Sequence, residues 1–429
     1  MTVTELSNIN NIPHLQQRPA MTSLNQNWLI CARCGSRQLK QQVQLADGRY
    51  YCPNCLLLGR VCSDAYLVSL TEPNKFDVPA DLLTWVGQLT PAQQKAAAAI
   101  RTYFAQQQDH LLWAVTGAGK TEMLFPGIAW ALTQKLRVGI ASPRVDVCLE
   151  LMPRVQAAFA NTPIMLLHGR QNEPYRYTQL VLCTTHQLLR FYHAFDVLII
   201  DEVDAFPYAQ NPQLAYATQQ AVKATGARLF LTATPSPQLL RQVRQKRLAL
   251  SYLPRRYHGH PLPQPKIRLC LKWRQQLYRQ RLPTLLQRLL TNKIAQGQHF
   301  LLFIPRIELL AHLAPLLQQQ FPDLKFATVH AADPQRLEKV QQMRQQQVSC
   351  LVTTTILERG VTFPGIDVIV LGADDAVFSA AALVQMAGRV GRSAARPTGA
   401  VDFLCAGLSR SVQQACRQIK QVNRKAGFK

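Results

Sequence analysis

A glycine-rich segment near residue 115 has the residue types and spacing that suit phosphate binding. Residues 114–121 read AVTGAGKT, between a strand-like run, LLWAV, and a helical stretch. Gly117 and Gly119 let backbone N–H groups curl around phosphate oxygens. Lys120 offers charge to the outer phosphates, and Thr121 offers a hydroxyl to magnesium. The residues predicted to bind ATP and Mg²⁺ are Thr116, Gly117, Ala118, Gly119, Lys120 and Thr121.

Two adjacent carboxylates follow an apolar run further along the chain. Residues 197–206 read VLIIDEVDAF, in which the β-branched run predicts a buried strand. Asp201 then lies at the carboxyl end of that strand, where it is predicted to hold Mg²⁺. Glu202 is predicted to orient and activate the attacking water.

A third segment, QMAGRVGRS at 385–393, offers guanidinium groups. Phosphoryl transfer builds negative charge on the γ-phosphate oxygens, which an arginine stabilises. Arg389 and Arg392 are three residues apart, so on a helix they face the same side. We predict that both act on the γ-phosphate when two halves of the molecule close; the alternative is a basic helix that contacts only nucleic acid.

Four cysteines near the N-terminus have the spacing of a metal site. Cys31 and Cys34 are separated by two residues, as are Cys52 and Cys55, with 17 residues between the pairs. Two such knuckles close a tetrahedral four-sulfur zinc site. Because four thiolates leave no open position for a substrate, we predict a structural role for the zinc.

The charge of the chain points to a polyanionic partner. The 429 residues carry a formal net charge of +24, and 17 basic residues but no acidic residue lie between Asp204 and Glu308. Basic side chains neutralise phosphates, and the interleaved aromatic rings can stack on bases, so nucleic acid is favoured over an anionic membrane surface. The chain shows neither a signal-peptide pattern nor an apolar run that could span a bilayer, which predicts a cytoplasmic protein that is not itself transmembrane.

Apolar runs that alternate with helical stretches predict the α/β class, with two parallel-sheet halves. The predicted parts are a flexible arm at 1–25, a zinc-binding module at 26–70, a linker at 71–84, a first lobe that binds ATP at 85–256, an inter-lobe linker at 257–266 and a second lobe at 267–429.

The segments above, in their order, resemble the motifs of superfamily-two helicases over most of residues 85–405. LTPAQ, AVTGAGKT, DEVD and TAT are similar to motifs of the first lobe, and TTTILERGVTFPGIDVIV and QMAGRVGR to motifs of the second. The resemblance implies two tandem RecA-like lobes, with Gln93 reading the adenine, and Thr232 and Thr234 coupling hydrolysis to the grip on nucleic acid. The residues that it implies contact the nucleic-acid strand are Arg144, Thr184, Thr185, Thr354, Thr355 and Arg359.

With the N-terminal cysteine module and the run TTHQLLRFYHAFDVLIIDEVDAFP, the chain resembles the ComFA family of competence DNA-uptake ATPases. This resemblance implies an ATP-driven motor on single-stranded DNA, with other DNA-uptake proteins as candidate partners and peripheral attachment to the cell membrane as an option. Three alternatives stay open: a repair or replication-restart helicase that unwinds duplex DNA, an RNA helicase, and a zinc-dependent nucleic-acid-binding protein with inactive ATPase lobes. The sequence leaves oligomeric state open.

Overall fold

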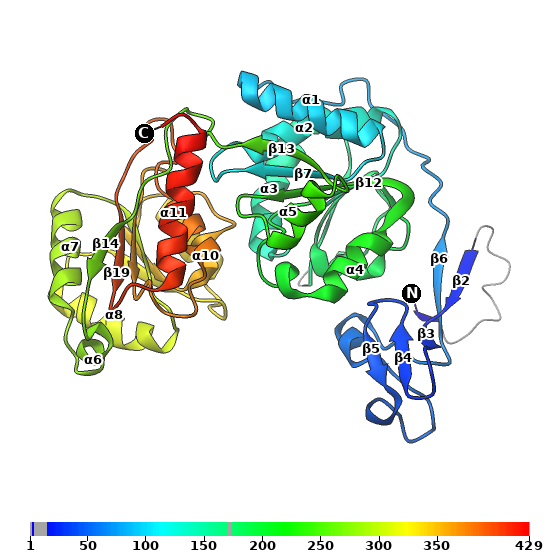
Figure 1. Cartoon of the computed structure of the whole chain (residues 1–429). Coiled ribbons are helices and arrows are strands. Elements are labelled where there is room, and N and C mark those ends of the chain that lie inside the picture. The colour runs from blue at the N-terminus through cyan, green and yellow to red at the C-terminus, as the bar shows by residue number, and fades with distance from the viewer. Residues whose placement is uncertain (1, 4–14, 170–172, 429) are drawn as a thin grey trace. The chain divides into compact units, whose positions relative to one another are not determined.

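The computed structural model describes residues 2–3, 15–169 and 173–428. The chain forms two compact units (Figure 1). The first unit runs from the N-terminus to Trp113 and continues over Lys120–Tyr252. The second contains residues 114–119 and Leu253–Lys429, so most of the predicted phosphate loop packs within the second unit. Within the described part of the chain, no helix combines the length and apolarity needed to cross a membrane.

Two small antiparallel sheets form the N-terminal module. One has the order β1-β6-β2 and the other β3-β4-β5. Their strands are β1 (Thr2–Val3), β2 (Leu15–Pro19), β3 (Met21–Ser23), β4 (Trp28–Cys31), β5 (Arg37–Leu39) and β6 (Tyr66–Leu70).

The prediction of a flexible arm at 1–25 is therefore wrong for residues 15–23. Strand β2 pairs with β6, and β3 pairs with β4. Ala20, between β2 and β3, and Met21, the first residue of β3, are buried beside the cysteines. Ladder hydrogen bonds and this burial outweigh the low strand preference of the polar residues around them. Residues 4–14 of the predicted arm lie outside the described residues.

The large sheet of the first unit has seven strands in the order β13-β7-β12-β11-β8-β10-β9. From β7 to β9 the neighbouring strands are parallel, and their near-continuous apolar runs are typical of strands buried on both faces. The strands are β7 (His110–Ala114), β8 (Val138–Ser142), β9 (Ile164–Leu167), β10 (Leu180–Thr184), β11 (Phe195–Ile200), β12 (Val222–Thr232) and β13 (Ala249–Leu253). The helices are α1 (Pro91–Ala105), α2 (Lys120–Thr133), α3 (Val145–Ala158), α4 (Pro212–Ala221) and α5 (Pro237–Arg244).

The sheet of the second unit has six strands in the order β14-β19-β18-β15-β17-β16, all parallel. The strands are β14 (Lys266–Leu269), β15 (Phe300–Phe303), β16 (Phe326–Val329), β17 (Cys350–Thr353), β18 (Asp367–Leu371) and β19 (Val401–Cys405). The helices are α6 (Trp273–Tyr278), α7 (Thr284–Ala295), α8 (Glu308–Gln320), α9 (Arg336–Arg344), α10 (Ala380–Ala387) and α11 (Arg410–Lys425). Helix α11 packs against α10 (Figure 1). Two parallel sheets and a four-cysteine module confirm the predicted fold class.

The predicted linker at 71–84 has neither helix nor strand, yet it is bound to the first unit. Glu72 forms a buried ion pair with Arg137, with Nη1 and Oε2 2.7 Å apart. Asn74 donates a hydrogen bond from Nδ2 to Asp196. A buried ion pair leaves an uncompensated charge if either partner is removed, so these contacts fix the path of the segment.

Candidate nucleotide site and metal centre

The phosphate loop joins β7 to α2. Strand β7 ends at Ala114, and α2 begins at Lys120. Gly117 and Gly119 have φ values of +80° and +72°, a region where a side chain is strained. The backbone N–H groups at the start of α2 have no partners within the helix, which makes this end a suitable place for an anion. The sequence prediction placed the loop correctly between a strand and a helix.

Lys120, Thr121 and Asp201 line one small cavity in the first unit. Asp201 follows β11, and its backbone N–H donates to the carbonyl of Ala141 at 2.8 Å. Desolvation and the neighbouring charge of Glu202 raise the pKa of Asp201 to about 6, although Lys120 opposes this shift. A carboxylate that is costly to ionise, beside a lysine and a hydroxyl, suits a site that gains a cation.

The geometry around Glu202 is compatible with the predicted role of this residue. Its φ is +52°, which is uncommon for a residue with a side chain. Its Oε2 atom is buried without a hydrogen-bond partner among the described residues. A buried carboxylate oxygen that lacks a partner can accept a proton or a hydrogen bond from a water.

Asp204 connects two of the predicted motifs. Its carboxylate accepts a hydrogen bond from Thr232 Oγ1 at 2.7 Å and another from Thr234 Oγ1. The N–H of Thr234 also donates to Thr232 Oγ1 at 2.9 Å. The DEVD motif alone does not show that Asp204 accepts from both threonines, because this contact forms only when β11 and β12 pair.

The prediction that Arg389 and Arg392 share a helix face is wrong. Helix α10 ends at Ala387, and the two arginines lie in the turn that follows. Gly391, between them, has φ +68°, which a continuing α-helix does not permit. Because the chain contains two glycines here, the helix loses stability at this point.

The two arginines have different surroundings in the second unit. Arg389 is 1% exposed and donates to the carbonyls of Glu358, at 3.0 Å, and Val361. Arg392 is less buried and donates from Nε to the carbonyl of Gly388 at 3.1 Å. Arg389 therefore holds the backbone of its own lobe, whereas Arg392 is the more accessible candidate for contact with phosphate.

Gln93 is 5% exposed and caps helix α1. Its Oε1 atom accepts from the backbone N–H of Thr90 at 2.9 Å, while Thr90 Oγ1 accepts from the N–H of Gln93. This reciprocal capping box starts the helix at Pro91. Recognition of adenine by Gln93 remains a prediction.

The candidate nucleic-acid residues of the first unit lie at the carboxyl ends of neighbouring strands. Arg144 immediately precedes α3, two residues after β8 ends. Thr184 ends β10 and pairs in register with Ser142 of β8, and Thr185 follows it. Ligands of open parallel sheets bind at this edge.

In the second unit the corresponding candidates follow β17. Thr354 is buried, and Thr355 begins a short 3₁₀ turn. Arg359 is 3% exposed and pairs with Glu358, with Nε and Oε1 3.5 Å apart. Strand contact by these three residues stays a prediction; Arg359 is the least exposed of them.

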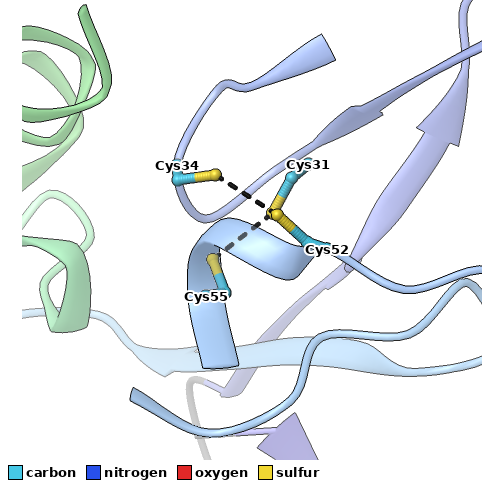
Figure 2. Close-up of side chains that lie close together, drawn as sticks. All are labelled: Cys31, Cys34, Cys52 and Cys55. Atoms are coloured by element: carbon cyan, nitrogen blue, oxygen red, sulfur yellow. Dashed lines mark hydrogen bonds between the residues drawn. The ribbon is translucent and has the colours of Figure 1, made fainter. Parts of the chain in front are cut away.

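The four predicted zinc ligands come together, and Figure 2 shows their side chains converging. All four sulfur atoms lie within 4.8 Å of one another. The Sγ atoms of Cys31 and Cys55 are 3.8 Å apart, and those of Cys34 and Cys52 are 3.6 Å apart. A tetrahedron with Zn–S bonds of about 2.3 Å has edges of about 3.8 Å, so these thiols fit a zinc ion.

The zinc module packs on helix α4 of the same unit, which the sequence did not predict. The guanidinium of Arg18 lies 3.7 Å from the centre of the Tyr192 ring and donates to Gln220 at 3.1 Å. The ring of Tyr216 covers Gly35, where an added Cβ would lie 2.6 Å from it. The first zinc knuckle is thereby held against the element that leads into β12.

Comparison with known proteins agrees with this arrangement. Residues 90–243 match the DEAD/DEAH box helicase model, and residues 280–394 match the helicase conserved C-terminal domain. The structure of the DEAD-box helicase Mss116 bound to ssRNA and UDP-BeF has a TM-score of 0.60 and 16% identity, covering 80% of this chain and 83% of that one. The matched domains make this chain an ATPase of the helicase class, which uses ATP and Mg²⁺.

Two relatives that match nearly the whole chain show the family to which it belongs. Competence protein ComFA of Streptococcus pneumoniae (strain ATCC BAA-255 / R6) is 44% identical, over 96% of this chain and 94% of the relative. Competence protein ComFA of Bacillus subtilis (strain 168) is 41% identical, over 94% and 87%. The chain belongs to the ComFA family of competence proteins.

Proposed function

We propose that this chain is an ATP-driven translocase on single-stranded DNA that acts in DNA uptake during competence. The observation that carries the proposal is its 44% identity, over 96% of the chain, to a competence protein. The cavity lined by Lys120, Thr121 and Asp201 supports the ATP site that the proposal requires. The absence of acidic residues between Asp204 and Glu308 supports a polyanionic substrate. The proposal includes binding to other DNA-uptake proteins, self-association of the chain, and attachment of the chain to the inner face of the membrane.

In this proposal Lys120 binds the outer phosphates, and the loop residues 116–119 enclose them. Asp201 and Thr121 hold Mg²⁺, which neutralises charge on the phosphates. Glu202 orients the attacking water, and Arg392 stabilises the charge that develops on the γ-phosphate. Arg389 donates hydrogen bonds to the carbonyls of residues 358 and 361 and so keeps in place the arginine turn, which is the turn after α10 that contains Arg389 and Arg392.

Thr232 and Thr234 are proposed to couple ATP hydrolysis to DNA binding. Thr232 and Thr234 join the Mg²⁺-binding segment to strand β12 through Asp204. Arg144, Thr184 and Thr185 would grip the DNA backbone in the first lobe, and Thr354, Thr355 and Arg359 would grip it in the second. The zinc module is proposed to keep its structural role.

The discriminating experiment measures the ATPase rate with single-stranded DNA, duplex DNA and RNA of equal length, at two salt concentrations. We expect the largest stimulation with single-stranded DNA and weaker stimulation at high salt, because phosphate neutralisation releases counterions. Lys120→Ala serves as the inactive control. Stronger stimulation by RNA would favour an RNA helicase, and duplex unwinding from a tailed substrate would favour a repair helicase. No hydrolysis under any condition would leave a binding protein with inactive lobes.

A further inference from the structure

Arg256 is a buried cation without a carboxylate partner. It is 2% exposed, and no carboxylate of the described residues acts on its charge. Nη2 donates to the carbonyl of Val390 at 2.7 Å and to that of Gly388 at 3.4 Å. Nε and Nη1 are buried without any hydrogen-bond partner in the described structure. Burial of a charge destabilises the fold unless a partner compensates it, so the buried guanidinium of Arg256 calls for a functional explanation.

The guanidinium lies between residues 116–119 of the phosphate loop and the turn that contains Arg389 and Arg392, and all of these residues belong to the second unit. A Cβ added at Gly117 would lie 2.9 Å from Arg256 Nε, and one added at Gly391 would lie 3.1 Å from Nη1. The N–H of Tyr257 donates to the carbonyl of Gly117 at 2.9 Å, which fixes the residue after Arg256 to the loop. The two atoms that lack partners are therefore the ones that approach the two glycine segments.

The electrostatic surroundings favour an anion. Burial, and after it the charge of Arg392, lower the pKa of Arg256 to about 9. Among the residues that the structure describes, no carboxylate raises this pKa. Two guanidinium groups that repel each other next to a phosphate-binding loop are both stabilised when a phosphate arrives.

We infer that Arg256 is a further phosphate-binding residue, whose Nε and Nη1 groups donate to the terminal phosphate of the nucleotide held by the phosphate loop. The inference rests on the proposed ATPase function. A residue that only braces the arginine turn would use Nη2, whose two carbonyl acceptors are already in place, and would not need a buried positive charge. Lys120 and Arg392 were identified from their motifs, but Arg256 belongs to none of them.

The test compares Arg256→Gln with Arg255→Gln in the full chain, without DNA. Arg255 is the matched control because it is the adjacent arginine and donates instead to the carbonyl of Ala426, at 2.7 Å. Dissociation constants for Mg·ATP and Mg·ADP are measured by competition with a fluorescent nucleotide, and melting temperatures are measured with and without pyrophosphate. Because DNA is absent, the result is independent of whether single-stranded DNA later proves to stimulate the wild-type ATPase.

We expect Arg256→Gln to weaken ATP binding by about 10- to 100-fold, the range for loss of a charged hydrogen bond, and to weaken ADP binding much less. Pyrophosphate should raise the melting temperature of the wild type and of Arg255→Gln, but not that of Arg256→Gln. An unchanged ATP affinity would overturn the inference. Equal weakening of ATP and ADP binding, together with a lower melting temperature without ligand, would also overturn it, because these are the results of a structural brace.

Discussion

Removal of the Asp204 carboxylate is expected to uncouple ATP hydrolysis from DNA. Asp204 accepts hydrogen bonds from the hydroxyls of Thr232 and Thr234, which link the segment that follows Asp201 to the end of β12. Hydrogen bonds to a charged acceptor contribute about 1.5–3 kcal/mol each. Because Asp204 is only partly buried, the lower value applies, which gives about 3 kcal/mol for the two bonds. That free energy corresponds to a factor of about 100 in an equilibrium or a rate.

Asp204→Ala should therefore lower the stimulation of ATPase activity by single-stranded DNA by up to about 100-fold, with a smaller effect on hydrolysis without DNA. The assay is steady-state phosphate release with and without saturating oligonucleotide, and a melting curve confirms that the variant folds. Thr232→Ser keeps a hydroxyl for the carboxylate and should retain most of the stimulation, whereas Thr232→Val should lose part of it. Undiminished stimulation in Asp204→Ala would refute the reasoning.

Other residues give further predictions. Burial lowers the pKa of His110 from 6.5 to about 4. Between these two pH values the unfolded chain binds a proton at His110 that the folded chain does not bind. The free energy of unfolding is therefore unaffected above pH 6.5 and falls by up to about 3 kcal/mol as the pH drops to about 4. His110→Gln should flatten the fall in melting temperature between about pH 7.5 and about pH 5, and an equally steep fall would contradict the assignment. Glu202→Gln should bind Mg·ATP normally but hydrolyse it about 100-fold or more slowly, and wild-type turnover would exclude Glu202 as the residue that activates water. Cys52→Ser should lower the zinc content of the purified protein and the melting temperature of its N-terminal module, and a metal assay that finds no zinc in the wild type would remove this metal from the account.

The parts of the site that the sequence predicted are those whose chemistry is local. The phosphate loop needs glycines with positive φ between a strand and a helix, and the order of Gly117, Gly119 and Lys120 shows this directly. The zinc ligands are similarly local, because each knuckle is a short turn that the spacing of its cysteines reveals. Apolar runs predicted the strands of both sheets, since strands buried on both faces are continuously apolar.

The parts that the sequence did not predict depend on packing between distant segments. Strand β2 forms because it pairs with β6, about 50 residues away, and the polar composition of residues 15–19 gives no local sign of that partner. The two glycines after Ala387 are a local sign that α10 ends there, whereas the spacing of Arg389 and Arg392 matches a continuing helix. The burial of Arg256 requires three separate segments to meet, so a basic run was all that its neighbourhood showed.

The most direct test of the account is movement along DNA. Streptavidin bound to a biotin at one end or the other of a single-stranded oligonucleotide is displaced by a motor that travels toward it, and Lys120→Ala supplies the control without ATP hydrolysis. We expect ATP-dependent displacement from one end by the wild type and none by Lys120→Ala. If the wild type hydrolyses ATP in response to single-stranded DNA but displaces streptavidin from neither end, the chain is not a translocase and the central claim is wrong.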